Sequence, residues 1–188
     1  MSDKWAQCLL DKRIVGVTRR KRAAMTDTLT VHTLRSEVVS ADAFDPFGVV
    51  LTPMEDGTPF TAEEAVLDVS GGIPRFYLMH LDDKPAAFVR VTRHLETTQT
   101  LMAVGDVEWT IAVAAPGIDE PGLDDLRAFL IPPRTAITMR KGTWHAGPFF
   151  ADPSMDFVNL ELDDTNVSDH HSHRLDDAFG VRVEIVAE

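Results

Sequence analysis

Apolar and polar residues alternate at a period of two along much of the chain after residue 28, which is the pattern of half-buried β-strands. Residues 29–34 form the first such segment, and residues 87–94 and 107–114 repeat it in the middle of the chain. Further strands are expected at 49–51, 75–80, 99–104, 126–131, 136–139, 157–162 and 181–186. A short helix is expected over 35–44, before a turn at 45–48.

Clusters of glycine, proline and aspartate separate these segments, and the pattern contains no long amphipathic helices. A parallel sheet with crossover helices is therefore disfavoured. Residues 52–70 are expected to form a long polar loop, with a helical turn near 63–65. Eight or nine short strands joined by such turns predict an all-β sandwich or small β-barrel with a few short helices.

The chain has 188 residues, 44% of them hydrophobic, which suffices for one well-buried core. Residues 1–27 are basic and show no apolar period, so we expect a poorly ordered N-terminal extension followed by a single domain over 28–188. The net charge of −12 opposes contact with phosphate backbones and anionic lipids. We therefore expect no nucleic-acid partner and no membrane partner.

The cysteine content and the apolar runs restrict the chain further. Cys8 is the only cysteine, so no disulfide can form within the chain and no metal site can be built from cysteines. This composition fits a cytoplasmic protein. We expect no signal peptide, because the apolar residues 8–10 are followed at once by charged residues. The sequence also has no apolar run that reaches the roughly 18 residues of a membrane helix.

Two isolated histidines, His94 and His145, stand beside expected strands and are the best candidates for chemistry. His94 and Gln99 together offer an imidazole nitrogen and an amide oxygen, which can bind one divalent cation or an oxygen-rich substrate. A turn at 141–142 is expected to deliver His145, with Trp144 as a wall of the pocket. If the sheet closes into a barrel, inward positions bring His94, Gln99 and His145 into one cavity. Taken singly, each is also consistent with a structural or surface residue.

Arginines would be needed to bind a carboxylate in so acidic a chain. The arginines in or beside expected strands are Arg75, Arg93, Arg127 and Arg140. The run Asp-His-His-Ser-His at 169–173 is similar to a metal site in composition. Neighbouring side chains on an extended chain point in opposite directions, however, so we do not expect this run to chelate one ion.

Five short motifs then occur in an order and at spacings that resemble the ureidoglycolate lyases, a family also called ureidoglycolate hydrolases. They are Arg75-Phe76-Tyr77, Arg93-His94-x4-Gln99, Leu126-Arg127-Ala128-Phe129, the run from Lys141 to His145, and Asp156-Phe157. The resemblance covers residues 28–170. It implies a cupin-type β-barrel and a cytoplasmic homodimer that splits (S)-ureidoglycolate into glyoxylate and urea during allantoin and purine degradation.

The resemblance also bears on cofactors. Cupin barrels commonly bind metal through two histidines one residue apart, an acid and a third histidine. Thr92 stands at the first histidine position here, and Gln99 falls close to the position of the acid. The remaining set of His94, Gln99 and His145 either holds a divalent metal weakly, nickel being the metal associated with the family, or binds the substrate with no metal.

The roles that follow are hypotheses about this reaction. His94 or His145 acts as the base, and Gln99 orients the hydroxyl or ureido group. Arg75 clamps the carboxylate. The other expected substrate-binding residues are Tyr77, Arg93 and Trp144.

Three alternatives stay open at this point. An amidohydrolase would release ammonia and carbon dioxide from ureidoglycolate, and it would need an activated water. A non-catalytic cupin would bind a small organic acid as a sensor or storage protein. A sugar or keto-acid isomerase would use the same barrel.

Overall fold

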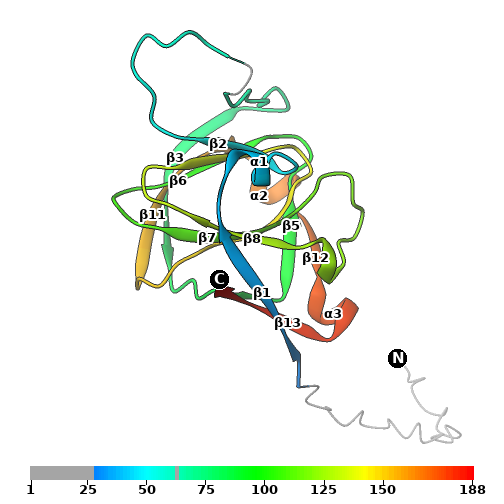
Figure 1. The fold of residues 1–188 in the computed structure, drawn as a ribbon. Helices are drawn as coiled ribbons and strands as arrows, with labels where there is room; N and C mark the ends of the chain where they lie inside the picture. The colour runs from blue at the N-terminus through cyan, green and yellow to red at the C-terminus, as the bar shows by residue number, and fades with distance from the viewer. Residues whose placement is uncertain (1–27, 62–63) are drawn as a thin grey trace, which may run out of the picture.

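A computed structural model describes residues 28–61 and 64–188 of the chain (Figure 1). The N-terminal extension expected at 1–27 lies outside the described residues, as does Glu63 of the expected helical turn. No helix among the described residues is long and apolar enough to cross a membrane.

The strands form two sheets that pack face to face (Figure 1). The larger sheet contains, in spatial order, β12 (His171–Arg174), β5 (Arg90–Arg93), β10 (Trp144–Phe149), β7 (Trp109–Ala114), β8 (Arg127–Ile131), β1 (Thr30–Val38), β13 (Val181–Ala187) and β4 (Ala87–Phe88). The smaller sheet contains β2 (Gly48–Leu51), β9 (Ala136–Met139), β6 (Gln99–Ala103), β11 (Ser154–Leu162) and β3 (Pro74–Asp82). Neighbouring strands are antiparallel, except that β1 runs parallel to both β8 and β13.

Large apolar side chains from both sheets form the main core. Trp109 and Phe129 come from the larger sheet, and Ile137 and Phe157 from the smaller one. The rings of Trp109 and Phe157 meet edge to face with their centroids 5.2 Å apart. Burying each such side chain stabilises the fold by about 1.5–3 kcal/mol. The expected all-β, barrel-like architecture with a few short helices is confirmed, and two curled sheets around a cavity agree with the cupin-type barrel that the resemblance implies.

The prediction of a helix over 35–44 is wrong. Strand β1 continues to Val38, and only α1 (Ala41–Phe44) is helical. Residues 34–38 are held in the extended conformation by pairing with β13 on one side and β8 on the other. The hydroxyl of Ser40 accepts a hydrogen bond from the amide of Ala43 and so caps α1.

Two strands near the site were not expected. Strand β10 contains His145 and follows the expected turn at 141–142, and β12 replaces most of the polar loop expected at 169–173. The other short helices are α2 (Thr165–Ser168), α3 (Leu175–Phe179) and the 3-10 turn η1 (Leu123–Asp125). The described part of the loop expected at 52–70 contains neither helix nor strand, as predicted.

Candidate active site

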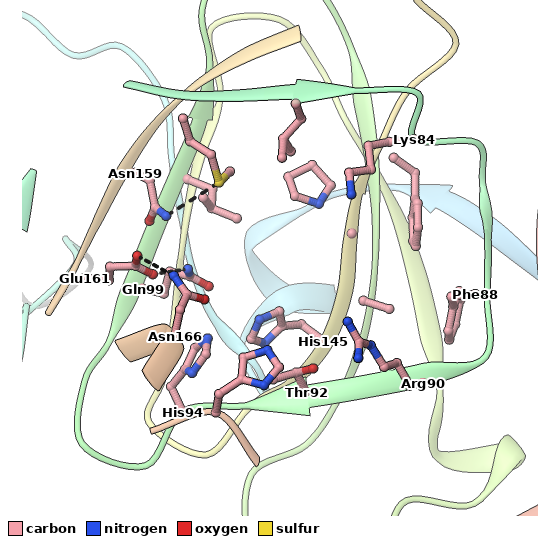
Figure 2. Close-up of a pocket in the computed structure, with 18 of the residues that line it drawn as sticks. Lys84, Phe88, Arg90, Thr92, His94, Gln99, His145, Asn159, Glu161 and Asn166 are labelled. Carbon is pink, nitrogen blue, oxygen red and sulfur yellow. Dashed lines mark hydrogen bonds between the residues drawn. The ribbon is translucent and has the colours of Figure 1, made fainter. Parts of the chain in front are cut away.

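A cavity of about 400 Å³ lies between the two sheets, within the size range of small-molecule sites (Figure 2). Alternation along the strands explains its lining. On β5 and just beyond it, the inward positions are Arg90, Thr92 and His94. The smaller sheet contributes Tyr77, Met79 and Leu81 from β3, Gln99 and Leu101 from β6, and Asn159 and Glu161 from β11.

Three histidines gather on one side of this cavity. His145 is paired with Thr92 across β10 and β5, and its ring centroid lies 5.1 Å from that of His94. The ring of His170 lies 6.0 Å from the ring of His94. The structure thus brings His94, Gln99 and His145 together as expected, and it adds His170, which the sequence reasoning had set aside.

The orientation of His94 is fixed by its contact with residue 169. Its Nδ1 lies 2.6 Å from the carbonyl oxygen of Asp169. A carbonyl oxygen only accepts, so Nδ1 carries a proton, and in the neutral form of the ring the lone pair is on Nε2. The buried carboxylate of Asp169 also accepts hydrogen bonds from the amides of Leu95, at 2.7 Å, and Glu96, at 2.8 Å. One residue therefore holds both the imidazole and the backbone turn that follows it.

His145 is held neutral by its surroundings. Burial, and to a smaller extent the neighbouring His94 and His170, lower its pKa to about 3, against a contact between its Nδ1 and the carbonyl oxygen of Thr143 at 3.2 Å. Burial and the same His94 also lower the pKa of His170, with Arg90 adding to the effect. His145 is therefore an uncharged imidazole at neutral pH.

This depressed pKa predicts a loss of stability in mild acid. Below pH 6.5 the unfolded chain takes up a proton at His145 that the folded chain rejects until about pH 3. The free energy of unfolding should fall by about 1.4 kcal/mol per pH unit for this group as the pH decreases through that window. Urea unfolding at pH 7.5 and 5.0 should show a smaller loss for His145→Gln than for the wild type. Equal losses would contradict the assignment.

One end of the cavity is formed by Glu161, whose carboxylate is 1% exposed. It accepts hydrogen bonds from the hydroxyl of Tyr77 at 3.0 Å, the amide of Gln99 at 2.7 Å and the amide of Asn166 at 3.3 Å. Burial, and then the charge of Glu161, raise the pKa of Tyr77, which therefore stays protonated. The sequence reasoning missed Glu161, although Asn159 and Glu161 are polar residues two apart in the otherwise apolar segment 157–162, and this spacing was a usable signal.

Two cations line the cavity away from Glu161. Arg90 and Lys84 lie at the end opposite Glu161, as Figure 2 shows. The sequence reasoning missed both, although Arg90 is two residues before Thr92 and four before His94, on the same face of the extended segment.

Three of the expected substrate-binding residues lie outside the cavity lining. The guanidinium of Arg75 stacks on the ring of Tyr77 at 3.7 Å, and only Tyr77 of this pair lines the cavity. Arg93 stacks on Trp144 at 4.5 Å, and both donate to the carbonyl oxygen of Ile118, at 2.9 and 2.8 Å. The direction of side chains alternates along β5, so Arg93 faces away from the site.

The donor set does not fit a tightly held metal. Catalytic metal ions in proteins normally have three or more protein ligands. In the described ranges 28–61 and 64–188, no group of three His, Cys, Asp or Glu side chains is placed to hold one ion. The expected set of His94, Gln99 and His145 contains two imidazoles and one amide oxygen, so we derive no catalytic step through a metal.

Comparisons with known proteins give one clear relationship. The family model of ureidoglycolate lyase matches residues 74–182. No curated protein matches the chain. Among solved structures, two of oxalate decarboxylase are similar. One was determined in work on the substrate binding mode and reaction specificity of that enzyme, and the other in work on the Mn(II) centres of the Bacillus subtilis protein. Each is 13% identical with a TM-score of 0.36, over 57% of this chain and 25% of the decarboxylase.

The chain spans only a quarter of the length of these decarboxylases, and a likeness at this level carries no conclusion about activity. The family match is different, because it covers more than half of the chain and includes Tyr77, His94, Gln99 and His145. The chain therefore belongs to the ureidoglycolate lyase family of enzymes.

Proposed function

We propose that this protein splits (S)-ureidoglycolate into glyoxylate and urea, as a cytoplasmic step of allantoin breakdown. The observation that carries the proposal is the fixed orientation of His94 in a chain of this family. Its Nδ1 is bound to the carbonyl oxygen of Asp169 and its Nε2 is free to act on a ligand. Arg90 and Lys84, in the same cavity, suit the carboxylate of such a substrate.

The reaction requires one proton to move. Ureidoglycolate is a carbinolamide, so removal of the hydroxyl proton at C2 lets the carbonyl form as the carbon–nitrogen bond breaks. In our proposal Nε2 of His94 takes this proton and returns it to the departing urea nitrogen. His145, with its pKa lowered to about 3, is too weak a base to compete and is not an imidazolium at neutral pH. We assign it the role of accepting a hydrogen bond from the substrate.

Two arginines, Arg90 and Arg75, are candidates for binding the carboxylate of the substrate, and their variants distinguish them. Arg90→Ala should lower kcat/KM by about 10–100-fold, mainly through a higher KM, because a charge-assisted hydrogen bond is lost. Arg75 remains the alternative clamp, and Arg75→Ala should have the smaller effect because Arg75 is stacked on Tyr77 outside the cavity lining. Steady-state kinetics of the two variants decide the matter. A larger loss in Arg75→Ala would place the carboxylate at the Tyr77 end.

The other expected residues take supporting parts in the proposal. Tyr77 and Gln99 contact the substrate from the smaller sheet, where they line the cavity. Arg93 and Trp144 act indirectly by fixing β5 against β10. In a metal-bound version of the proposal, His94, Gln99 and His145 hold a divalent ion weakly, and nickel is the first candidate.

The experiment that tests this function uses purified, chelator-treated protein and racemic ureidoglycolate, with and without added divalent metal. Glyoxylate, urea and ammonia are followed together. Equal amounts of glyoxylate and urea without metal support the lyase proposal. Ammonia in place of urea would indicate the hydrolase, and activity only after metal addition would indicate the metal-bound form. No turnover, together with stabilisation by small acids, would indicate a binding protein.

We also propose that the protein is a homodimer. The outward face of the edge strand β3 supports this, because Phe76 is 72% exposed and Leu78 is 68% exposed. Exposed apolar side chains on an edge strand favour association with another chain. Analytical ultracentrifugation should give the mass of a dimer, and a monomeric mass at micromolar concentration would contradict the proposal.

A further inference from the structure

The carboxylate of Glu161 orders the polar end of the cavity. It is almost fully buried and accepts three hydrogen bonds from the neutral side chains of Tyr77, Gln99 and Asn166. A buried carboxylate is tolerated when such donors surround it. Because Tyr77 holds its own proton, all three groups present an N–H or O–H to Glu161.

This contact fixes which way two amides face. An ionised carboxylate accepts only, so Gln99 and Asn166 must each turn their NH2 group toward Glu161. Their carbonyl oxygens then point the other way, and Figure 2 shows both directed from Glu161 toward the cavity. The oxygen Oε1 of Gln99 is buried and has no hydrogen-bond partner in the part of the chain that the structure describes. An unpaired buried acceptor is costly, so a ligand that donates to it gains affinity.

We propose that Glu161 is a positioning residue that builds a two-acceptor subsite, from Oε1 of Gln99 and Oδ1 of Asn166, for the N–H groups of a ureido ligand. A terminal ureido group carries parallel N–H donors on its two nitrogens and suits a pair of acceptors. A carboxylate or an ester has no N–H and would place lone pairs against lone pairs. This inference rests on the proposed function and names the group that selects its substrate.

The subsite also sets the direction in which the substrate binds. Glu161 with its two amides lies at one end of the cavity, and Arg90 with Lys84 at the other (Figure 2). A ureido acid therefore binds with its nitrogen end at Gln99 and its carboxylate at Arg90. His94 lies between the two ends in Figure 2, where the carbon that joins them would sit.

The test compares two ligands that lack the C2 hydroxyl on which the proposed cleavage depends. Ureidoacetate has the carboxylate and the ureido group of the substrate but no C2 hydroxyl. Acetoxyacetate has nearly the same shape and no N–H donor. Calorimetric titration of the wild-type protein should show at least about tenfold tighter binding of ureidoacetate, because two hydrogen bonds depend on its N–H groups. Equal affinities, or no binding of either ligand, would overturn the proposal.

Variants then separate positioning from general damage. In Glu161→Gln the new amide can donate as well as accept, so Gln99 and Asn166 are free to turn, and the preference for ureidoacetate should fall below about threefold. Acetoxyacetate should bind at least as tightly as it does to the wild type, because the amides can now turn N–H groups toward it. A preference that survives Glu161→Gln would overturn the role of the carboxylate.

A second pair of variants covers the case in which Glu161→Gln does not fold. Asn166 is exposed on the short helix α2, so Asn166→Leu should fold, and it should lower the preference by removing one acceptor. Ser168→Ala is the matched control, because Ser168 lies on the same helix and its hydroxyl donates to Asp164. Ser168→Ala should keep the full preference for ureidoacetate. If Ser168→Ala and Asn166→Leu lower the preference equally, the proposal is contradicted. Neither readout needs turnover, so a protein without lyase activity still tests the subsite.

Discussion

Replacing His94 by glutamine should lower kcat for ureidoglycolate cleavage by about 10²–10⁴-fold, the usual contribution of a general base. Glutamine can still donate to the carbonyl oxygen of Asp169, as Nδ1 of His94 does at 2.6 Å. It has no basic nitrogen to take the hydroxyl proton. KM should therefore change by less than about threefold, because binding depends on Arg90 and on the amides near Glu161. Steady-state kinetics at pH 7.5 on the metal-free protein provide the measurement.

The matched control is His170→Gln. His170 lines the same cavity with its ring 6.0 Å from the ring of His94, and the lowering of its pKa by burial makes it a weaker base than an ordinary imidazole. Its replacement should cost less than about tenfold in kcat. A wild-type kcat in His94→Gln would reject the base assignment, and a larger loss in His170→Gln would transfer the role to His170.

The strand positions could be predicted because alternation in a sequence reflects one buried and one exposed face. This held for 75–80 and 136–139, which fall in β3 and β9, and for 99–104, which extends one residue beyond β6. It failed for β10, where Gly147 and Pro148 interrupt the pattern and pairing with β7 and β5 decides the conformation. It failed also at 35–44, where pairing on both sides of β1 outweighs local preference.

The candidate site was predictable only in part, because alternation does not say which face of a strand turns inward. His94 and Gln99 were found from their residue types. Arg93 was expected to bind the substrate and Arg90 was not considered, yet the pairing of β5 with β10 and β12 turns Arg90 into the cavity and Arg93 away from it. Glu161 escaped notice because the amides that make it useful, those of Gln99 and Asn166, come from separate elements, β6 and α2.

Replacing Asp169 by asparagine should damage stability and catalysis together. The carboxylate of Asp169 accepts hydrogen bonds from the amides of Leu95 and Glu96, and its own carbonyl oxygen holds His94. Asparagine keeps one acceptor oxygen and turns an NH2 group toward the other amide. Loss of one hydrogen bond to a buried charge predicts a decrease of about 1.5–3 kcal/mol in the free energy of unfolding. A shift of the turn carries His94 with it, so kcat should fall by about tenfold or more.

Urea unfolding and kinetics on the same preparation check both effects, with Asp164→Asn as the control. Asp164 lies beside α2 and bonds to the exposed Ser168, so its replacement should leave kcat unchanged and cost little stability. A stable Asp169→Asn protein with wild-type kcat would show that the turn holds its shape without this carboxylate. If instead stability falls while kcat is kept, the orientation of His94 depends on the carbonyl oxygen alone. A loss of both stability and kcat would mean that the buried carboxylate of Asp169 holds the turn after β5 and, through that turn, orients His94. The same side chain would then be needed for the fold and for catalysis.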